Sequence, residues 1–321
     1  MDNRFLALKQ NVRKRIIVSL KWAVGLGYIA IGSPGFRSKL ITVVFHEVSD
    51  QPSTHAKLTN TYSTTQTYLK QISLLKSVFN FIDLQTQLDP IRTKKCLITF
   101  DDGYKGSLEA ARILELSGIP SIHFINLQTI YGDPNSSALL HFKSISSSFS
   151  TAWSNSTPNK LSKILDEISN IEKEEFVKFA GPYLSPLELK ELKTFKNVTF
   201  GDHFLNHWFA NSLSENEVIT NLARNAPQFL ESEWIENFFA APHGEISKEK
   251  IELVSFEGYK TIFSGQSWMT VGDAQVLPRI DMNESIKSRA TLFGSIAIMI
   301  FRSSRNNRSE EHLRKSGFPA T

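Results

Sequence analysis

The chain has 321 residues, with 36 Lys+Arg against 32 Asp+Glu and a formal net charge of +4. A composition of 41% hydrophobic and 21% charged residues excludes a wholly disordered, collagen-like or low-complexity protein. The single cysteine, Cys96, excludes an internal disulfide and a metal site built from several thiolates. Although the pI is about 9.0, no zinc-finger, helix-turn-helix or RNP-like signature is present, so we expect no nucleic-acid partner.

The first 38 residues differ from the rest and are predicted to form a separate N-terminal segment. Basic residues precede a mostly apolar stretch, Ile16 to Ile31, which Lys21 interrupts. The spacing of the apolar residues fits a basic amphipathic helix lying on a membrane surface. Residues 23–31 also resemble the apolar core of a signal or anchor segment, and a helix packed on the protein is a third reading. Lys21 argues against a membrane span, which needs about 20 apolar residues.

Short runs rich in β-branched and aromatic residues recur along the middle of the chain, separated by stretches with helical spacing or by polar loops. This alternation predicts an α/β fold with a parallel sheet covered by helices, either open or closed into a barrel. The predicted strands are Leu40 to Phe45, Lys95 to Phe100, Ser121 to Ile125, Val198 to Phe200, Phe238 to Ala240, Lys260 to Phe263 and Gln275 to Leu277.

Helical spacing fills most of the intervals between these strands. Two predicted helices begin with a Ser followed three residues later by a Glu, which is the capping-box pattern: Ser185 with Glu188, and Ser214 with Glu217. The predicted helices are Thr65 to Ser77, Gly106 to Ser117, Lys160 to Phe179, Ser185 to Thr194, Ser214 to Leu230 and Ser247 to Phe256.

Two regions depart from the alternating pattern. Residues 129–183 combine a Ser/Asn-rich loop with a charged helix and are predicted to be an insertion, facing either the substrate or solvent. Residues 302–321 mix Arg, Ser, Asn and Glu with few large apolar residues, so we expect a frayed, flexible tail after Phe301. The main domain is therefore predicted to span residues 39–301.

Ionisable residues follow four of the predicted strands directly. His46 follows the first, Asp101 and Asp102 the second, Asp202 and His203 the fourth, and His243 comes shortly after the fifth. In a parallel α/β fold the carboxyl ends of all strands lie on one face, where the chemistry of such folds collects. We therefore expect these side chains to converge.

The residue types in this group are those of a catalytic metal site. Adjacent carboxylates on an extended backbone point to opposite sides, so Asp101 and Asp102 are predicted to have different roles, although Asp-Asp-Gly is also a common turn. His203 and His207 share a face if the segment between them is helical. Two histidines and one carboxylate leave coordination positions open for water and substrate.

The order of these motifs resembles that of the polysaccharide deacetylase family, a carbohydrate-esterase-like group whose catalytic unit is the NodB homology domain. The resemblance extends over roughly residues 40–281 and implies a distorted (β/α)7 barrel. The matching motifs are Phe45-His46-Glu47-Val48, Thr99-Phe100-Asp101-Asp102-Gly103-Tyr104, Phe200-Gly201-Asp202-His203 through His207, and Phe239-Ala240-Ala241-Pro242-His243-Gly244.

Carried over residue by residue, the resemblance implies three metal ligands, Asp102, His203 and His207, with Asp101 as the catalytic base. The implied cofactor is one divalent ion, with zinc the first candidate and cobalt, nickel or manganese as alternatives. His46 resembles the general acid, and its near-neutral reference pKa suits that role. Tyr104, Pro242, His243 and Trp268 are predicted to contact substrate.

Several positions depart from the family pattern. An Arg commonly stands four residues before the proline of the last motif, but Phe238 occupies that position. Arg279, at the end of the last strand, could supply that charge to Asp101 from another loop, and a surface Arg is the alternative. His243 stands where Tyr usually follows the proline, and it competes with His46 for the role of acid. The other two departures flank the second histidine: Phe204 replaces a small hydroxyl residue and Trp208 a common proline.

The resemblance implies a hydrolase that removes N-acetyl groups from an oligo- or polysaccharide, free or lipid-linked, in bacterial exopolysaccharide, capsule or lipopolysaccharide assembly. The alternative is a catalytically silent glycan-binding or membrane-associated scaffold of the same fold. Residues 1–31 are expected to contact a membrane peripherally, which suits a cytoplasmic or membrane-associated protein. Secretion or anchoring through the N-terminus stays open, as do the sugar, the metal and the oligomeric state.

Overall fold

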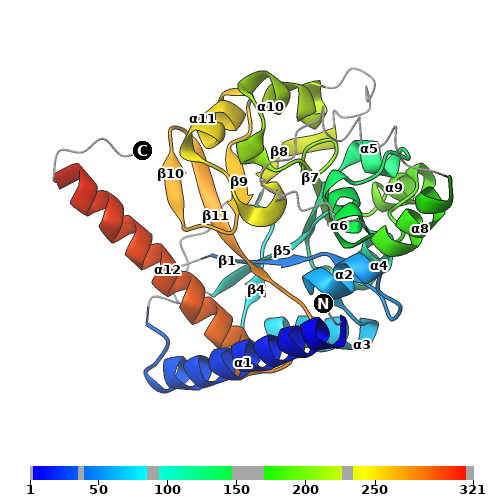
Figure 1. Ribbon diagram of the computed structural model, residues 1–321. Coiled ribbons are helices and arrows are strands. Elements are labelled where there is room, and N and C mark those ends of the chain that lie inside the picture. Colours follow the sequence, from blue (N-terminus) through cyan, green and yellow to red (C-terminus); the bar gives the residue numbers. More distant parts are fainter. Residues whose placement is uncertain (1–2, 35–39, 85–93, 147–169, 226–233, 316–321) are drawn as a thin grey trace.

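A closed parallel barrel of seven strands forms the centre of the protein (Figure 1). The computed structural model describes residues 3–34, 40–84, 94–146, 170–225 and 234–315. Going round the barrel, the order is β1-β11-β9-β8-β7-β6-β5, and pairing of β5 with β1 closes it. The barrel strands are β1 (Ile41–Phe45), β5 (Lys95–Phe100), β6 (Ser121–Ile125), β7 (Val198–Asp202), β8 (Ile235–Ala240), β9 (Thr261–Ser264) and β11 (Ala274–Asp281).

Short strands add to this frame. β10 (Met269–Val271) pairs with β11 in the antiparallel sense, and β4 (Asn80–Phe81) pairs with β5. A separate pair, β2 (Glu47–Val48) and β3 (Tyr62–Ser63), follows the end of β1. The seven barrel strands are those that the sequence predicts, so the expected closed-barrel fold is confirmed.

Alternation along the strands sorts side chains between the barrel interior and the surrounding helices. Interior side chains from five strands form one apolar cluster around Phe124 and Phe263. A Cβ built on Gly201 would overlap the Phe124 ring, so only glycine lets β7 pass this filled interior. The cluster consists of Leu97, Ile122, Phe124, Ala240, Phe263 and Leu277.

Helices surround the barrel and connect its strands. The capping boxes at Ser185 and Ser214 are both present as predicted. The helices are α1 (Asn3–Ala30), α2 (Thr54–Thr59), α3 (Thr65–Lys76), α4 (Gly106–Leu116), α5 (Leu127–Ile130), α6 (Ser136–Ser146), α8 (Asn170–Ala180), α9 (Pro186–Leu192), α10 (Glu215–Asn221), α11 (Lys248–Phe256) and α12 (Arg289–Lys315), with 3-10 turns η2 (Ala210–Ser212), η3 (Ala223–Asn225) and η5 (Pro242–Gly244).

Three helix predictions need correction or restriction. The helix predicted from Ser214 to Leu230 ends at Asn221, because Leu222 is extended and the next backbone N–H, that of Ala223, donates to the Asp202 carboxylate. α8 matches the second half of the helix predicted over 160–179, and residues 160–169 lie outside the described residues. Residues 302–315 continue α12, so the expectation of an irregular tail after Phe301 is wrong there. Arg, Glu and Lys favour helix, and neither Gly nor Pro occurs between residues 302 and 316.

The N-terminal helix α1 packs against α12 at very close range. A Cβ built on Gly25 would overlap the carbonyl oxygen of Ala290, and one built on Gly294 would overlap that of Lys21. The two backbones therefore touch where the helices cross. Lys21 is half-buried at this crossing, and burial lowers its pKa although Asp281 opposes the shift. Within the described residues, no helix is long and apolar enough to cross a membrane.

Candidate metal centre and active site

A cavity of about 690 Å³ opens at the carboxyl ends of the barrel strands. Its volume suits a ligand the size of a small saccharide. The sequence-predicted residues His46, Asp101, Asp102, His203, His207, His243 and Arg279 all line it. Of the ionisable residues expected to converge there, Asp202 alone does not line the cavity.

Asp102, His203 and His207 form a buried group whose ligand atoms all lie within 4.8 Å of one another. Asp102 Oδ1 lies 3.3 Å from His203 Nε2 and 3.1 Å from His207 Nε2. All three residues are buried. One carboxylate oxygen and two imidazole nitrogens therefore face a common point.

The chemistry of this group fits a divalent metal ion. Asp102 Oδ1 and His203 Nε2 are buried without a hydrogen-bond partner among the described residues. His203 Nδ1 lies 2.7 Å from the Ala240 carbonyl oxygen, which only accepts, so Nδ1 carries a proton and Nε2 is the ring atom that can bind a metal. Oxygen and imidazole donors of this kind are typical ligands of zinc and similar ions.

Burial and mutual charge set the protonation of the three residues. Burial acts to lower the pKa of His203, but Asp101 and Asp102 outweigh it and raise this pKa. Burial lowers the pKa of His207 well below its usual value, although Asp102 opposes the shift. Burial acts to raise the pKa of Asp102, but His207 and the other nearby histidines outweigh it and hold this pKa below its usual range. A neutral His207 and an ionised Asp102 are the forms in which these side chains bind metals.

The segment carrying His203 and His207 is a loop, so the helical spacing that the sequence suggested is wrong. Phe204 and His207 both have left-handed backbones, with φ of 57° and 54°. Asp102 (69°) and His243 (60°) share this conformation. Non-glycine residues seldom adopt it, and such residues cluster at functional sites.

The left-handed backbone of Asp102 also corrects the expectation for the two adjacent carboxylates. They do not point to opposite sides, because both line the same cavity. His203 Nε2 lies 3.3 Å from Asp102 Oδ1 and 3.6 Å from Asp101 Oδ2. The two carboxylates differ in their partners rather than in the direction they face.

Buried polar residues hold the histidine loop in shape. The Asp202 carboxylate accepts from the backbone N–H of Phe204 and of Ala223 and from the Tyr259 hydroxyl. The Asn126 side chain donates to the carbonyl oxygens of His203 and Phe204. These bonds satisfy backbone groups that a helix would have paired internally.

A second anchor comes from α6, in the predicted insertion. Ser136 Oγ lies 2.6 Å from the Asn206 carbonyl oxygen and 3.0 Å from that of His207. Ser137, the next residue, lines the cavity and contacts His243. The insertion is predicted to face either the substrate or solvent, and its segment at Ser136 and Ser137 faces the cavity.

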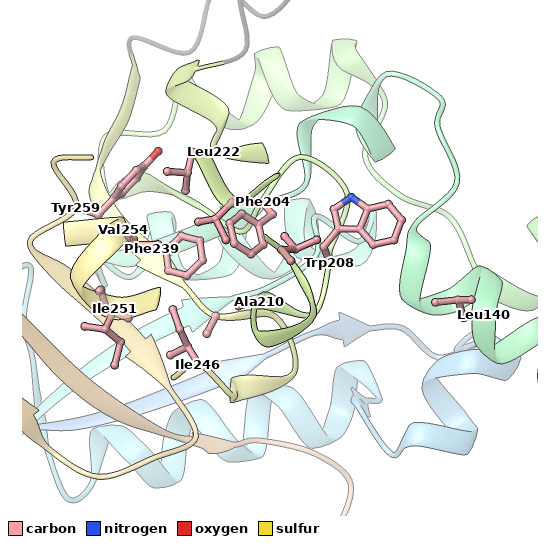
Figure 2. Packing of buried hydrophobic residues seen from close by; sticks show 14 of the residues in the cluster. Leu140, Phe204, Trp208, Ala210, Leu222, Phe239, Ile246, Ile251, Val254 and Tyr259 are labelled. Atoms are coloured by element: carbon pink, nitrogen blue, oxygen red, sulfur yellow. The ribbon is translucent and has the colours of Figure 1, made fainter. Parts of the chain in front are cut away.

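The side chains that depart from the family pattern anchor the same loop in the core. The Phe204 ring lies 4.9 Å from the Phe239 ring, and Trp208 is also buried in this cluster (Figure 2). Figure 2 shows Phe204 among Phe239, Ala210 and Leu222. Large apolar residues beside the two histidines thus replace polar support with hydrophobic packing.

Asp101 is paired with Arg279 on β11. The guanidinium nitrogens lie 2.6 and 2.7 Å from the two carboxylate oxygens, a bidentate arrangement with both side chains buried. Phe238, at the position where an Arg is common in the family, packs against Phe263 instead. The charge beside Asp101 is therefore supplied from another strand, as the sequence suggested.

His46, His55 and His243 are the histidines of the cavity wall outside the ligand group, and of these only His46 and His243 were candidates for the general acid. His243 Nε2 lies 2.9 Å from Ser137 Oγ, and its ring lies 4.8 Å from that of His207. Burial lowers the pKa of His243 to about 4, so its ring is neutral at pH 7. His46 follows β1 and is partly exposed.

Three residues predicted to contact substrate do not line the cavity. Tyr104 is buried and stacks on Tyr183, with ring centroids 4.9 Å apart. Trp268 packs against the apolar clusters around the barrel, and Pro242 is buried beside His243. Tyr104 and Trp268 therefore belong to the core. The alternation of side chains along a strand does not show whether a residue near the strand end faces the cavity or the core.

The residues that support the loop, Asn126, Ser136, Asp202 and Tyr259, were not assigned roles from the sequence. Asp202 directly precedes His203, so its position was a signal that could have been used. The others lie directly after β6, in α6 and before β9, and no local pattern links them to the histidines.

Solved structures of similar fold include several deacetylases. A polysaccharide deacetylase from Bacillus cereus has a TM-score of 0.53 and 12% identity, covering 81% of this chain and 69% of its own. The deacetylase PplD of Streptococcus pyogenes, in complex with acetate, has a TM-score of 0.52 and 13% identity, covering 81% and 98%. A de-N-acetylase from Aggregatibacter actinomycetemcomitans has a TM-score of 0.53 and 14% identity, covering 80% and 99%.

Sequence comparison alone finds no such relationship. No protein-family model matches the chain, and no curated protein matches it. At identities of 12–14% the structural likeness establishes the fold, which is that of the NodB-like polysaccharide deacetylases.

Proposed function

We propose that this chain, with its NodB-like barrel, is a metal-dependent hydrolase that removes N-acetyl groups from a saccharide. The observation that carries the proposal is the convergence of Asp102, His203 and His207 beside an Arg-paired Asp101 in one cavity. The similar structures include a polysaccharide deacetylase and a de-N-acetylase, which supports the reaction class. We propose zinc as the metal, since a carboxylate and two imidazoles are common zinc ligands.

Each side chain has a distinct role in this proposal. Asp102, His203 and His207 would hold the ion, which when bound would polarise the amide carbonyl and acidify a water molecule. Asp101 takes the proton of the attacking water, because it is buried in the cavity and oriented by Arg279. Its two oxygens are fixed by the guanidinium, so the base needs no rearrangement.

His46 is proposed to donate a proton to the leaving amine. It lines the cavity at the end of β1 and has no part in the ligand group. His243, the competing candidate, is held by Ser137 at Nε2 and lies against His207, which suits substrate binding better. Replacing His46 with Gln should therefore reduce amine release far more than replacing His243 with Gln.

The pairing of Arg279 with Asp101 weakens the alternative of a silent scaffold. That alternative gained support from Phe238, which leaves the base without the usual neighbouring Arg. Since Arg279 supplies an equivalent contact, the departure is compensated in the structure. A role in cell-envelope assembly stays a prediction.

Metal content tests the proposal first. The purified protein should hold about one divalent ion per chain, and His203→Ala with His207→Ala should lose it, because one carboxylate alone binds such ions weakly. The measurement is elemental analysis after dialysis. His55→Ala, which replaces a histidine of the same cavity outside the ligand group, is the control. Full metal content in the double variant would rule out these ligands.

Activity is the second test. Amine release should be measured on N-acetylglucosamine oligomers and on lipid-linked saccharides, with and without chelator. We expect release from at least one substrate, its loss with chelator, and its recovery on adding zinc. A protein that binds metal and glycan but releases no amine from either substrate class would support the silent alternative.

A further inference from the structure

The outward side of α1 carries apolar side chains with no covering element among the described residues. Ile16, Leu20, Ala23, Gly27 and Ala30 recur at intervals of three or four and are all exposed, Ile16 by 62% and Leu20 by 58%. Figure 1 shows α1 at the lower edge of the molecule, beside the first turns of α12. We call this the α1 face and include in it the exposed side chains Val12, Ile17, Trp22, Leu26 and Ile31.

Lys21, which counted against a membrane helix in the sequence, is not part of the α1 face. It is half-buried at the crossing of α1 with α12, where its carbonyl oxygen meets Gly294. From Ile16 to Ile31 the chain has no other charged residue. The exposed side of this stretch is therefore wholly uncharged.

An apolar groove continues the surface between the two helices. It has a volume of about 960 Å³ and is lined chiefly by Val24, Tyr28, Ile31, Ala297 and Phe301. Phe301 is 71% exposed at its edge. Arg302 lines both this groove and the cavity that contains Asp102, so the α1 face adjoins the candidate active site.

Positive charge is concentrated in the same two helices. α1 and α12 together hold 12 of the 36 Lys+Arg but only 2 of the 32 Asp+Glu, which gives them a net charge of +10. The remaining residues then have a net charge of −6, since the whole chain is +4. Arg15, at the start of the apolar stretch, is exposed.

We propose that the α1 face docks on an anionic lipid bilayer, with its apolar side chains among the acyl chains and the basic residues near the headgroups. Basic charge alone would also suit nucleic acid. A phosphate backbone, however, would make no apolar contacts with the exposed Ile and Leu side chains of this face. An exposed apolar face that includes a Trp and has exposed Arg residues near it, here Arg15 and Arg302, is the pattern of interfacial helices. The inference rests on α1 and α12 and does not depend on the proposed function.

Vesicle sedimentation with the full chain tests the proposal. The protein should sediment with vesicles of phosphatidylglycerol and phosphatidylcholine, much less with phosphatidylcholine alone, and less again as salt rises. Ile16→Ser with Leu20→Ser should weaken binding at least about tenfold, because both side chains would lose their acyl contacts. The control is Leu116→Ser with Phe256→Ser, which removes two even more exposed apolar side chains, on α4 and α11, and should leave vesicle binding unchanged.

The fluorescence of Trp22 provides a second measurement of vesicle binding, one that needs no separation of bound from free protein. Its emission should shift to shorter wavelength on adding anionic vesicles, and Trp22→Phe should remove that shift while leaving sedimentation largely intact. Equal binding by the Ile16/Leu20 variant and the wild type would overturn the proposal. So would a dimer, seen by light scattering, that this variant dissociates while neither protein binds vesicles, because a second copy would then cover the α1 face.

Discussion

Asp101 and Asp102 are adjacent and nearly equally buried, yet their partners divide them into two chemical types. Both oxygens of Asp101 contact Arg279, whereas Asp102 Oδ1 faces two imidazole nitrogens. Asp101→Asn should therefore keep the metal but lose the base, and amine release should fall by at least about two orders of magnitude. Elemental analysis and the rate assay on the same preparation check this. An undiminished rate would place the base elsewhere.

The buried Asp101–Arg279 pair also affects stability. Asp101→Asn or Arg279→Gln alone leaves a buried charge without its partner, which should lower the free energy of unfolding by about 3 kcal/mol. The double variant should lose less than the two single losses combined, because neither charge remains. Urea unfolding of the four proteins measures the coupling. Strict additivity would mean that the two side chains do not interact.

For individual residues, the sequence predicted which side chains lie close together but not the backbone conformation that places them there. The strand-end positions of Asp102 and His203 indicated a common site, and Arg279 was rightly expected near Asp101. The shape of the loop was not predictable, because the left-handed backbones of Phe204 and His207 depend on bonds to Asp202, Asn126 and Ser136 from elsewhere.

Near the crossing of α1 and α12, the α1 glycines Gly25 and Gly27 have opposite surroundings. A Cβ on Gly25 would overlap Ala290, whereas one on Gly27 would meet nothing within 4 Å. Gly25→Ala should therefore push the helices apart and destabilise the protein. Gly27→Ala should stabilise it by up to about 1 kcal/mol, because alanine favours helix.

Thermal unfolding and limited proteolysis of α1 measure this pair of variants. Gly25→Ala should unfold at lower temperature and expose α1 to cleavage, with Gly27→Ala as its matched control. If the two variants behaved alike, the close contact of the two backbones would be refuted.

Element predictions succeeded where a strand is buried and failed where it is short. The strands β1, β5 and β6 are almost entirely buried and rich in apolar residues, which sequence patterns detect. β2, β3 and β4 have two residues each, too few for any periodicity. The continuation of α12 beyond Phe301 was missed because its polar residues give no amphipathic signal.

For the whole molecule, His123 links stability to pH. It is buried on β6, stacked on Phe100 with ring centroids 4.5 Å apart, and burial lowers its pKa to about 3. The unfolded chain, with an ordinary histidine pKa near 6.5, binds a proton below that pH while the folded protein does not. Stability should thus fall with acid between about pH 6.5 and 3, by up to about 1.4 kcal/mol per pH unit from this group.

His123→Phe removes the group that binds this proton. The free energy of unfolding of the variant should therefore change less between about pH 6.5 and 3 than that of the wild type. The measurement is the urea midpoint from pH 7 to pH 4 for both proteins, so that contributions from other groups cancel. Parallel curves would show that His123 is not responsible.

Closure of the barrel is a property of the whole chain that local patterns left open. Alternating strands and helices allowed either an open sheet or a barrel, and only the family resemblance favoured closure. In the structure, pairing of β1 with both β5 and β11 decides it. These contacts join residues about 50 and 240 positions apart, so no window of sequence contains them.

The loop that presents His203 and His207 is fixed by Asp202, Asn126, Ser136 and a buried Phe204, none of which is a ligand. The loop is thus held by protein contacts rather than by the proposed metal, unlike small zinc modules that are unfolded without metal. On the proposed function, we therefore expect the chain to fold without metal and to form a stable apoprotein. Ion supply would then regulate its activity without changing its abundance.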